Sequence, residues 1–539
     1  MAKDTANFVS EQFEALNSEG YSSLIDAFLA SCGDNAKEVV FKCMGHPLTF
    51  AQLEAASGAF AGFLLNETDL EPGDRIAIQL PNVPQYPIAA WGALRAGLIL
   101  VNTNPMYTRR ELAYQLEDSG ARAIVILESL LANHETVIAS AGLDHVISVH
   151  PADLAKPRPA PDSKLPNLMA FSEALARGGR HDFKDAPMSM SDIAALQYTG
   201  GTTGVAKGAI LTQGNLFAAC RISKASFPLE LEEGEREVVI APMPLYHVYG
   251  FAVNAIGMVL RGATSVLVPD PRNIDSLIDA MVEQPFTWMA SVNTLLIALL
   301  QHPRLDEVDF SKTMGIIAGG APLVPEVAEA WERRTGSRVF EGYGLSESTA
   351  SGAVNNVHHR KLGSIGRCVQ HTEAKVVDES GKRLGHGQPG ELLIRGPQVM
   401  RGYWQNPEGS EAAFDAEGWL HTGDIATIDE DGFIQIVDRK KDMVLVSGFN
   451  VYPTEVEGVI YGHPDVIECA VIGVPDAKCG EAVKAFVVSR NLELTADEIR
   501  AHCREELTAY KVPREVEFRE ELPKSAVGKI LRRELRELE

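Results

Sequence analysis

The chain has 539 residues, which exceeds the size at which a single hydrophobic core keeps growing, so we expect two or more domains. Hydrophobic residues make up 45% and charged residues 23%, which is ordinary for a folded protein and argues against disorder. The formal net charge of −24 argues against nucleic acid as a partner, because neutralising phosphates requires a basic face.

Three further features suggest a cytoplasmic protein. The seven cysteines form no CxxC pair, and their odd number favours a reducing compartment. The first residues lack the apolar region of a signal peptide. The longest uncharged stretch, residues 238–260, contains Pro242, Pro244 and Asn254, and we interpret it as buried core plus loop, not as a membrane helix.

Between about residues 75 and 350, short apolar runs alternate with helical patterns. Residues 75–81, 123–127, 238–243 and 314–320 predict buried strands that end in turn residues. Residues 324–336 predict a helix, with Pro325 near its start and Gly336 at its end. Strands that alternate with helices indicate an α/β fold with layered, mostly parallel sheets.

The pattern changes near residue 440. Residues 466–474 and 482–488 predict strands, and residues 454–457 and 495–498 predict capping boxes that begin helices. We therefore expect a small, separate α+β domain at the C-terminal end.

Residues 198–208, YTGGTTGVAKG, form a loop rich in Gly and Thr between an apolar run and the helix expected after Thr212. Glycines let backbone N–H groups approach phosphate oxygens, and Thr hydroxyls add donors. Lys207 does not match the GxxxxGK[ST] pattern, so a P-loop NTPase is disfavoured. The loop predicts a polyphosphate site, with a flexible surface loop as the alternative.

Two later motifs contain groups suited to a nucleotide. In EGYGLSES, residues 341–348, Tyr343 can lie beside a purine, Ser346 can donate to a phosphate and Glu347 can hold Mg²⁺. In residues 418–453, Asp424 can accept hydrogen bonds from a ribose diol and Arg439 can supply a second sugar contact. Each residue taken alone is better explained by packing, a turn or a solvated charge.

Taken together and in order, these segments resemble the adenylate-forming superfamily of acyl-CoA synthetases, luciferases and peptide-synthetase adenylation domains. The motifs that carry the resemblance are YTGGTTGVAKGA, PLYHVYG, EGYGLSE, VDRKKDMVLVSGFNVYP and LPKSAVGKILRREL, and it covers essentially the full length. The segment GWLHTGDIATIDEDGFIQIVDRKKDM resembles the signature of fatty-acyl-CoA synthetases. The similarity is specific for the superfamily, strong for acyl-CoA ligases and weaker for the length of the acyl chain.

The resemblance implies the adenylate-forming enzyme fold, with a large N-terminal domain (1–438), a hinge (439–441) whose pivot aligns with Lys441, and a mobile C-terminal domain (442–539). It also implies two half-reactions, in which a fatty acid and ATP give acyl-AMP and pyrophosphate, and acyl-AMP and CoA give acyl-CoA and AMP. The expected ligands are therefore the fatty acid, ATP, Mg²⁺ and CoA.

The resemblance assigns roles to individual residues. Lys529 would bridge carboxylate and phosphate oxygens, Thr199 and Glu347 would hold Mg²⁺, and His247 would lie at the mouth of the acyl pocket. Ser346 and His247 are counted as catalytic residues together with Lys529 and Glu347. The other binding residues are Tyr198, Thr199, Gly200, Gly201, Thr202, Thr203, Gly204 and Lys207 for the phosphates, Asp424 and Arg439 for ribose, Gly319, Gly320, Ala321, Glu341, Gly342, Tyr343 and Gly344 for the adenine and acyl walls, and Gly448 and Asn450 for the CoA thiol.

Several alternatives stay open. The same chemistry could act on medium-chain or aryl acids, which the pocket segments 245–256 and 291–294 would decide. The enzyme could also stop at acyl-AMP, or the chain could be a non-catalytic acyl or nucleotide binder. Peripheral contact with the inner face of the membrane and a homodimer are also open.

Overall fold

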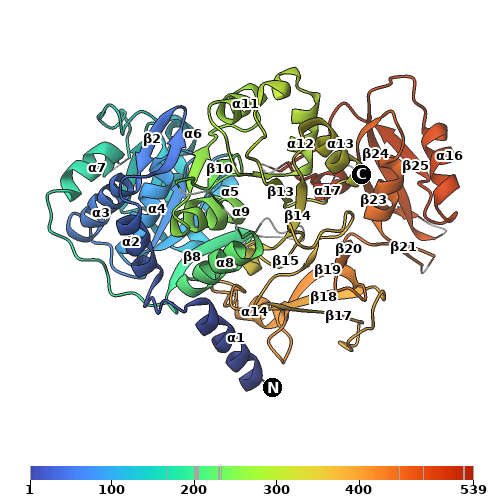
Figure 1. Cartoon of the computed structure of the whole chain (residues 1–539), viewed down its shortest axis with the longest axis horizontal. Coiled ribbons are helices and arrows are strands. Elements are labelled where there is room, and N and C mark those ends of the chain that lie inside the picture. Colours follow the sequence, from blue (N-terminus) through green and yellow to red (C-terminus); the bar gives the residue numbers. More distant parts are fainter. Residues whose placement is uncertain are drawn as a thin grey trace.

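The computed structural model describes residues 2–165, 167–199, 206–228, 231, 234–447, 449–476, 479–525 and 528–537, with side chains from Asn7 onward. Within these residues the strands form four sheets, which we name A to D. Sheets A, B and C precede residue 440, and sheet D follows it (Figure 1).

Sheet A is parallel in its centre and antiparallel at both edges. Its order is β16 (Arg367–Cys368), β15 (Ala353–Val354), β14 (Val339–Tyr343), β13 (Gly315–Gly319), β12 (Trp288–Ser291), β10 (Val238–Ala241), β11 (Thr264–Leu267), β1 (Val39–Cys43) and β2 (His46–Thr49). Central strands such as β11 and β12 are buried along their whole length, as expected where both faces of a sheet are covered.

Sheet B is parallel except for its last pair of strands. Its order is β7 (Leu168–Ala170), β6 (His145–Val149), β5 (Ala121–Leu127), β3 (Arg75–Gln79), β4 (Ile99–Asn102), β8 (Ile193–Thr199) and β9 (Lys207–Thr212). The strands predicted from residues 75–81, 123–127, 238–243 and 314–320 are confirmed as β3, β5, β10 and β13.

Helices surround these two sheets (Figure 1). They are α2 (Leu24–Asp34), α3 (Phe50–Asn66), α4 (Gln85–Arg95), α5 (Arg109–Ser119), α6 (Glu128–Ala141), α7 (Phe171–Gly178), α8 (Gln213–Ser226), α11 (Ile274–Val282), α12 (Asn293–Gln301) and α13 (Pro325–Thr335), with the 3₁₀ turns η2 (Pro303–Glu307) and η3 (Ser346–Ser348). In the same view, α1 (Ala2–Leu16) extends away from the body of the molecule, and α14 (Pro407–Ala413) lies beside sheet C. The predicted helix between Pro325 and Gly336 is confirmed as α13. All seven cysteines are free thiols, and six of them are buried.

The interpretation of residues 238–260 as core plus loop is partly wrong. After β10 and a short turn, α9 (Val248–Gly250), the π-helix η1 (Phe251–Gly257) and α10 (Met258–Leu260) form one continuous helical segment. Both prolines precede the helix, and a helix buried on most sides carries little polar periodicity by which to recognise it. Across the described residues, no helix is long and apolar enough to cross a membrane.

Sheet C was not predicted. It is antiparallel, in the order β17 (Glu373–Val377), β18 (Gly390–Arg395), β19 (Leu420–Ile428) and β20 (Ile434–Arg439), and it lies below sheet D in Figure 1. Its strands are only partly buried and are joined by polar turns, so they lack the continuous apolar runs that revealed sheets A and B.

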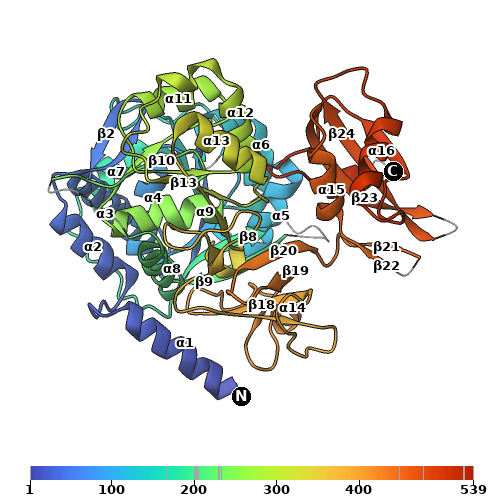
Figure 2. The same cartoon turned by 45° about the vertical axis from the view of Figure 1, so that its right-hand side comes forward.

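Sheet D confirms the small α+β unit expected at the C-terminal end, which Figure 2 shows as a separate lobe. It contains β21 (Val444–Val446), β22 (Phe449–Val451), β23 (Val466–Asp476), β24 (Gly480–Ser489) and β25 (Glu515–Phe518), with α15 (Pro453–Tyr461), α16 (Ala496–Glu506) and α17 (Arg532–Glu537) around it.

The capping box predicted for α16 is present, with Thr495 and Glu498 bonded reciprocally. The box predicted at residues 454–457 is wrong, because the N-cap of α15 is Tyr452 and the helix begins at Pro453, two residues earlier than expected. The N–H of Thr454 donates instead to Asp438 Oδ2, at 2.8 Å. A carboxylate from β20 therefore takes over the capping role that was assigned to a local side chain.

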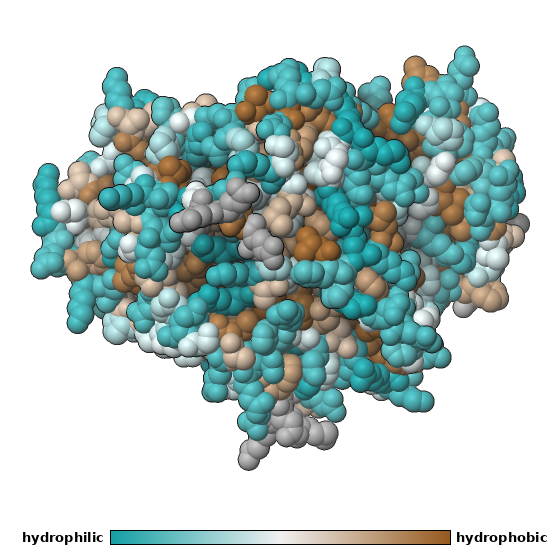
Figure 3. All heavy atoms as spheres, in the orientation of Figure 1, coloured by the Kyte–Doolittle hydropathy of each residue, from teal (hydrophilic) through white to brown (hydrophobic). Residues whose placement is uncertain are grey.

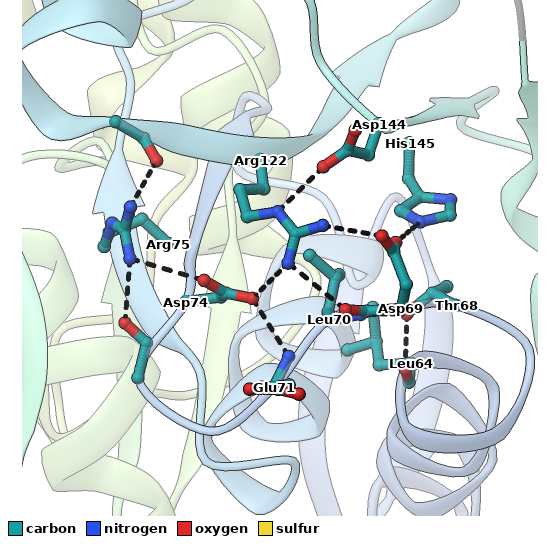
Figure 4. Close-up of polar contacts among 12 residues, drawn as sticks. Leu64, Thr68, Asp69, Leu70, Glu71, Asp74, Arg75, Arg122, Asp144 and His145 are labelled. Carbon is teal, nitrogen blue, oxygen red and sulfur yellow. Dashed lines mark hydrogen bonds and ion pairs between the residues drawn. The ribbon is translucent and has the colours of Figure 1, made fainter.

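Near the amino ends of β3, β5 and β6, Arg122 holds three carboxylates together (Figure 4). Its guanidinium nitrogens lie 2.7 Å from oxygens of Asp69, Asp74 and Asp144. Asp69 also meets His145 at 2.9 Å. Ligands of parallel sheets bind at the opposite, carboxyl ends of the strands, so we interpret this network as a structural brace.

Candidate active site

The predicted phosphate loop connects two antiparallel strands. Tyr198 on β8 lies opposite Gly208 on β9, and Thr199 lies opposite Lys207. The helix expected after Thr212 is confirmed as α8, with Thr212 as its N-cap, and β9 lies between the loop and this helix. Five of the predicted phosphate-binding residues lie outside the described residues: Gly200, Gly201, Thr202, Thr203 and Gly204.

Two tyrosines attach the ends of this loop to α5. The Tyr198 hydroxyl donates to Asp118 Oδ2 at 2.6 Å. The Tyr114 hydroxyl lies 2.9 Å from the carbonyl oxygen of Ala206 and 3.2 Å from Asp118 Oδ1. Burial raises the pKa of Tyr198 well above its ordinary value, so the hydroxyl keeps its proton. The Tyr198 side chain is thus engaged with α5, and it fixes where the loop begins.

Glu341 supports the turn that follows β13. It is buried, and its Oε1 accepts the N–H of Leu323 at 3.0 Å. Burial raises the pKa of this carboxyl to about 7. The bond holds the turn that contains Gly320 and Ala321, while Gly319 pairs with Gly342 across β13 and β14. The predicted adenine and acyl walls therefore meet at the carboxyl ends of two neighbouring strands.

The predicted ribose ligands form a connected group. Asp424 and Arg439 lie opposite each other on β19 and β20, and Arg439 Nε is 3.1 Å from Asp424 Oδ1. The Tyr343 hydroxyl donates to Asp424 Oδ2 at 2.5 Å. A pocket of about 280 Å³ opens here, lined by Thr422, Gly423, Asp424, Arg439, Lys440 and Lys441. A buried carboxylate held in place between two donors can still accept hydrogen bonds, because each oxygen has two lone pairs.

A tight turn carries Ser346 and Glu347. A Cβ on Gly344 would lie 2.2 Å from the carbonyl carbon of Ala350, so only glycine allows this approach. Ser346 and Glu347 are half-buried in η3. Glu347 Oε1 accepts the Tyr403 hydroxyl at 2.8 Å. Both side chains therefore lie just after the end of β14, whose last residue is Tyr343.

The donor set near Glu347 suits magnesium carried by a nucleotide. No group of three or more His, Cys, Asp or Glu side chains that could hold a metal occurs among the described residues. Mg²⁺ is commonly bound through one or two carboxylates plus substrate phosphates, not by an all-protein cage. Glu347 together with ATP oxygens fits that pattern. The hydroxyl of Thr199, the second predicted ligand, lies 3.5 Å from the carbonyl oxygen of Lys207.

Lys529 reaches the site from the C-terminal lobe. It is half-buried at the end of a turn in which its carbonyl oxygen accepts the N–H of Ser525 at 2.7 Å. The next residue toward the N-terminus, Gly528, meets Thr294 on α12. The turn thus places Lys529 against the N-terminal part of the molecule.

The groups that shift the pKa of Lys529 show which charged side chains lie near it. Burial is the main cause that lowers the pKa of Lys529 to about 7, and the nearby Arg439 adds to the effect while Asp424 opposes it. Burial likewise lowers the pKa of His247 to about 4, with a further contribution from Lys529. The structure therefore brings together Lys529, His247, Asp424 and Arg439, which are far apart in the sequence.

The chain passes from one lobe to the other at Lys441. On one side, Lys440 Nζ lies 3.0 Å from Glu391 of sheet C. On the other, Asp442 is bound by Arg532, at 3.4 Å, and by Arg536, at 2.9 Å, both of α17. Lys441 itself is exposed between these two sets of ion pairs. Its neighbours are thus attached to different lobes.

The residues predicted for the CoA thiol do not lie with this group. Asn450 and Phe449 are exposed on β22, at the edge of sheet D. Phe449 stacks on Tyr510 of the same lobe, with ring centroids 4.9 Å apart. Gly448 lies outside the described residues.

Two site residues, Tyr403 and Thr294, were missed by the sequence analysis. Tyr403 lies in no segment that was interpreted chemically, and its only signal was its place in RGYW, beside tight turns. Thr294 lies within residues 291–294, which were assigned to the acyl pocket only as a segment, and no pattern indicated its contact with Gly528.

A two-lobed fold, a buried carboxylate paired with an arginine, and a lysine that reaches this pair from the second lobe define an adenylate-forming enzyme. The chain belongs to the AMP-binding enzyme family: that family's model matches residues 28–404, and the model of the AMP-binding enzyme C-terminal domain matches residues 455–529.

The curated relatives include the long-chain-fatty-acid–CoA ligase of Escherichia coli O157:H7, which is 45% identical over 97% of this chain and 95% of its own length. Among solved structures, ATP-bound MatB from Rhodopseudomonas palustris has a TM-score of 0.86 at 29% identity, covering 96% of this chain and 98% of that one. Apo MatB has a TM-score of 0.75 at equal coverage. The anthranilate CoA ligase AuaEII in complex with anthranoyl-AMP has a TM-score of 0.87 at 26% identity, covering 96% and 97%.

Proposed function

We propose that this chain is an AMP-forming fatty acid–CoA ligase that acts on long-chain acids. The observation that carries the proposal is the position of Lys529 beside Asp424, Arg439 and His247. The near full-length similarity to a long-chain-fatty-acid–CoA ligase supports the choice of substrate.

In the first half-reaction, a carboxylate oxygen of the fatty acid attacks the α-phosphorus of ATP and pyrophosphate leaves. Two anions must meet, so the chemistry needs positive charge at the point of contact. Lys529 supplies it between the carboxylate and the phosphate, and Arg439 and Asp424 hold the ribose. Mg²⁺ bound at Glu347 would offset charge on the phosphates. Since a fatty acid is ionised at neutral pH, no general base is required.

The state described here suits this half-reaction. The greater similarity to ATP-bound than to apo MatB supports that view. In the second half-reaction, the CoA thiol attacks the acyl carbon, the acyl–phosphate bond breaks and AMP leaves. We propose that rotation about Lys441 withdraws Lys529 and brings the exposed hairpin with Asn450 to the thiol route. The separate ion pairs of Lys440 and Asp442 support this position for the hinge.

His247, Tyr249 and Gly319 would form the entrance to the acyl pocket. The Tyr249 hydroxyl donates to the carbonyl oxygen of Ile317 at 2.8 Å, and a Cβ on Gly319 would lie 3.7 Å from the Tyr249 ring. The absence of a side chain at Gly319 leaves space for a thin ligand. Burial of each methylene contributes about 0.8 kcal/mol, so affinity should rise with chain length until the pocket ends.

The test is product identification by mass spectrometry. The purified enzyme is incubated with ATP, Mg²⁺, CoA and a series of acids from hexanoate to oleate, with benzoate and coumarate alongside. Palmitoyl-CoA or oleoyl-CoA with AMP as the strongest products supports the proposal. A maximum on short or aromatic acids keeps the chemistry and changes the substrate, accumulation of acyl-AMP indicates an acyl-AMP ligase, and absence of AMP refutes catalysis.

A cytoplasmic location, peripheral membrane contact and a homodimer stay predictions. On the face shown in Figure 3, apolar side chains occur in small separate groups among polar ones.

A further inference from the structure

Tyr403 contacts two residues that are expected to bind the nucleotide's phosphates and metal. Its hydroxyl donates to Glu347 Oε1 at 2.8 Å. Lys207, at the end of the phosphate loop, places its ammonium nitrogen 5.0 Å from the centroid of the Tyr403 ring, within the range of a cation–π interaction. One side chain therefore lies between the expected metal carboxylate and the loop lysine.

The backbone of Tyr403 is fixed to the same loop. Residues 401–404 run antiparallel to β9, with Tyr403 bridged to Ala209. The Ile210 N–H donates to Gly402 O at 2.9 Å, and the Trp404 N–H donates to Gly208 O at 2.8 Å. The Tyr403 N–H donates to Ser410 Oγ at 2.8 Å. A displacement of β9 would consequently carry Tyr403 with it.

The geometry points to Tyr403 as a positioning residue for Glu347, the expected magnesium ligand. Its hydroxyl orients the Glu347 carboxylate relative to the phosphate loop, so that a metal bound by Glu347 can also bind the ATP phosphates. This inference rests on the proposed function of Glu347. Tyr403 touches no reacting atom.

The physical reason is the freedom of a glutamate side chain. The terminal torsion of Glu is broad, and ordering such a side chain costs free energy. A hydroxyl that donates to Oε1 fixes the plane of the carboxylate, and with it the direction in which Oε2 points. A tyrosine hydroxyl is protonated at neutral pH, so it acts as the donor to the carboxylate.

The experiment measures binding instead of turnover. Isothermal titration gives the dissociation constant of α,β-methylene-ATP with saturating Mg²⁺ and again with EDTA, for the full-length enzyme. The ratio of the two constants is the metal-dependent gain in affinity. Tyr403→Phe removes the hydroxyl and keeps the ring over Lys207. Hydrogen bonds to charged groups are strong, so we expect a gain about tenfold smaller and an unchanged affinity in EDTA.

Tyr86→Phe is the control, because it also removes the hydrogen bond of a tyrosine hydroxyl to another side chain, Asn102, at a residue that holds neither the phosphate loop nor Glu347. Its metal-dependent gain should equal that of the wild type. Glu347→Gln should lose the gain, and adding Tyr403→Phe to it should have no further effect on the ratio. Melting curves check that each variant is folded.

The outcomes separate the two proposals. If Tyr403→Phe weakens binding equally with Mg²⁺ and with EDTA, or leaves the ratio unchanged, Tyr403 is not a positioning residue for the metal carboxylate. If Glu347→Gln keeps the full gain, the assignment of Glu347 to magnesium fails, and the inference about Tyr403 fails with it.

Discussion

The hydroxyl of Thr294 lies 3.5 Å from the carbonyl oxygen of Gly528, and this contact joins α12 to the turn that presents Lys529. Gly528 has a φ of +75°, and a Cβ there would lie 2.5 Å from Thr294 Oγ1. The position therefore needs glycine for its backbone conformation and for the close approach of the two lobes.

Gly528→Ala should displace Lys529 from the nucleotide site. Because a misplacement of about 1 Å can reduce a rate about 100-fold, we expect a comparable loss of fatty acid-dependent pyrophosphate release. Transfer of a preformed acyl-adenylate to CoA should be largely retained. Thr294→Ala in the same chain removes the oxygen that the new methyl group meets, so it should restore part of the first activity; no recovery would contradict this steric account.

Lys529→Ala tests whether the positive charge of Lys529 is needed for the first half-reaction. Removing one group that stabilises the transition state typically lowers a rate by about 10² to 10³, and we expect at least that loss in pyrophosphate release. Conversion of synthetic acyl-adenylate and CoA to acyl-CoA should continue. An equal loss in both half-reactions would refute the idea that Lys529 serves only the first.

The lowered pKa of Lys529 predicts a pH dependence. The ammonium form is needed to meet ATP, and in the free enzyme it is lost as the pH rises through about 7. The kcat/KM for ATP should therefore fall above neutral pH, since this parameter reports groups of the free enzyme. Lys529→Arg keeps its charge throughout, so its profile should be flat across the same range, whatever its absolute rate.

The same group links pH to stability. The pKa of Lys529 is about 7 when folded and about 10.4 when unfolded, so the unfolded chain binds the extra proton between these values. The penalty for burying this lysine is complete below about pH 7 and disappears as the pH rises toward about 10.4. Lys529→Met should accordingly raise the melting temperature most at low pH, as differential scanning calorimetry at pH 6 and pH 9 would reveal.

Arg532 should be important for the stability of the C-terminal lobe. It is mostly buried and binds Glu457 at 2.6 Å as well as Asp442. Arg532→Met would leave two buried carboxylates without this partner, at a cost of about 3 kcal/mol or more. Hydrogen exchange in sheet D should accelerate more than in sheet B. Arg536→Met, which removes a more exposed partner of Asp442, should cost less.

Arg122→Met should destabilise the protein without changing its chemistry. The substitution breaks the network shown in Figure 4, and partial exposure limits the expected loss to about 1 kcal/mol. The melting temperature should fall while the KM for ATP stays constant. A changed KM would mean that this brace communicates with the nucleotide site.

The sequence predicted those strands and helices whose residue patterns depend on local interactions alone. The central strands of sheets A and B are apolar on both faces, and α13 lies between Pro325 and Gly336, so both could be read directly. Sheet C could not, because its half-exposed strands carry no such runs. The start of α15 was misplaced because its capping carboxylate, Asp438, comes from another element.

The candidate site likewise contains residues that a motif identified and partner residues that no motif identified. Asp424, Arg439, Glu347 and Lys529 were proposed from motifs, and their roles stay predictions. The partners that hold these groups, such as Tyr403 for Glu347, lie far away in the sequence and have no local pattern. The hydrogen bond of Tyr343 to Asp424 also escaped notice, although both residues had been singled out.

The order of pairing within sheet A has a consequence for biosynthesis. β1 lies next to β11, with Phe41 opposite Ser265. This apolar strand is synthesised early and cannot pair until β11 has been synthesised much later. Non-local pairing of this kind slows folding and leaves strand edges exposed to aggregation. Sheet D, by contrast, is assembled from one contiguous segment. A nascent chain emerging from the ribosome should therefore need chaperone protection during synthesis of its first half, and should complete its last lobe rapidly after release.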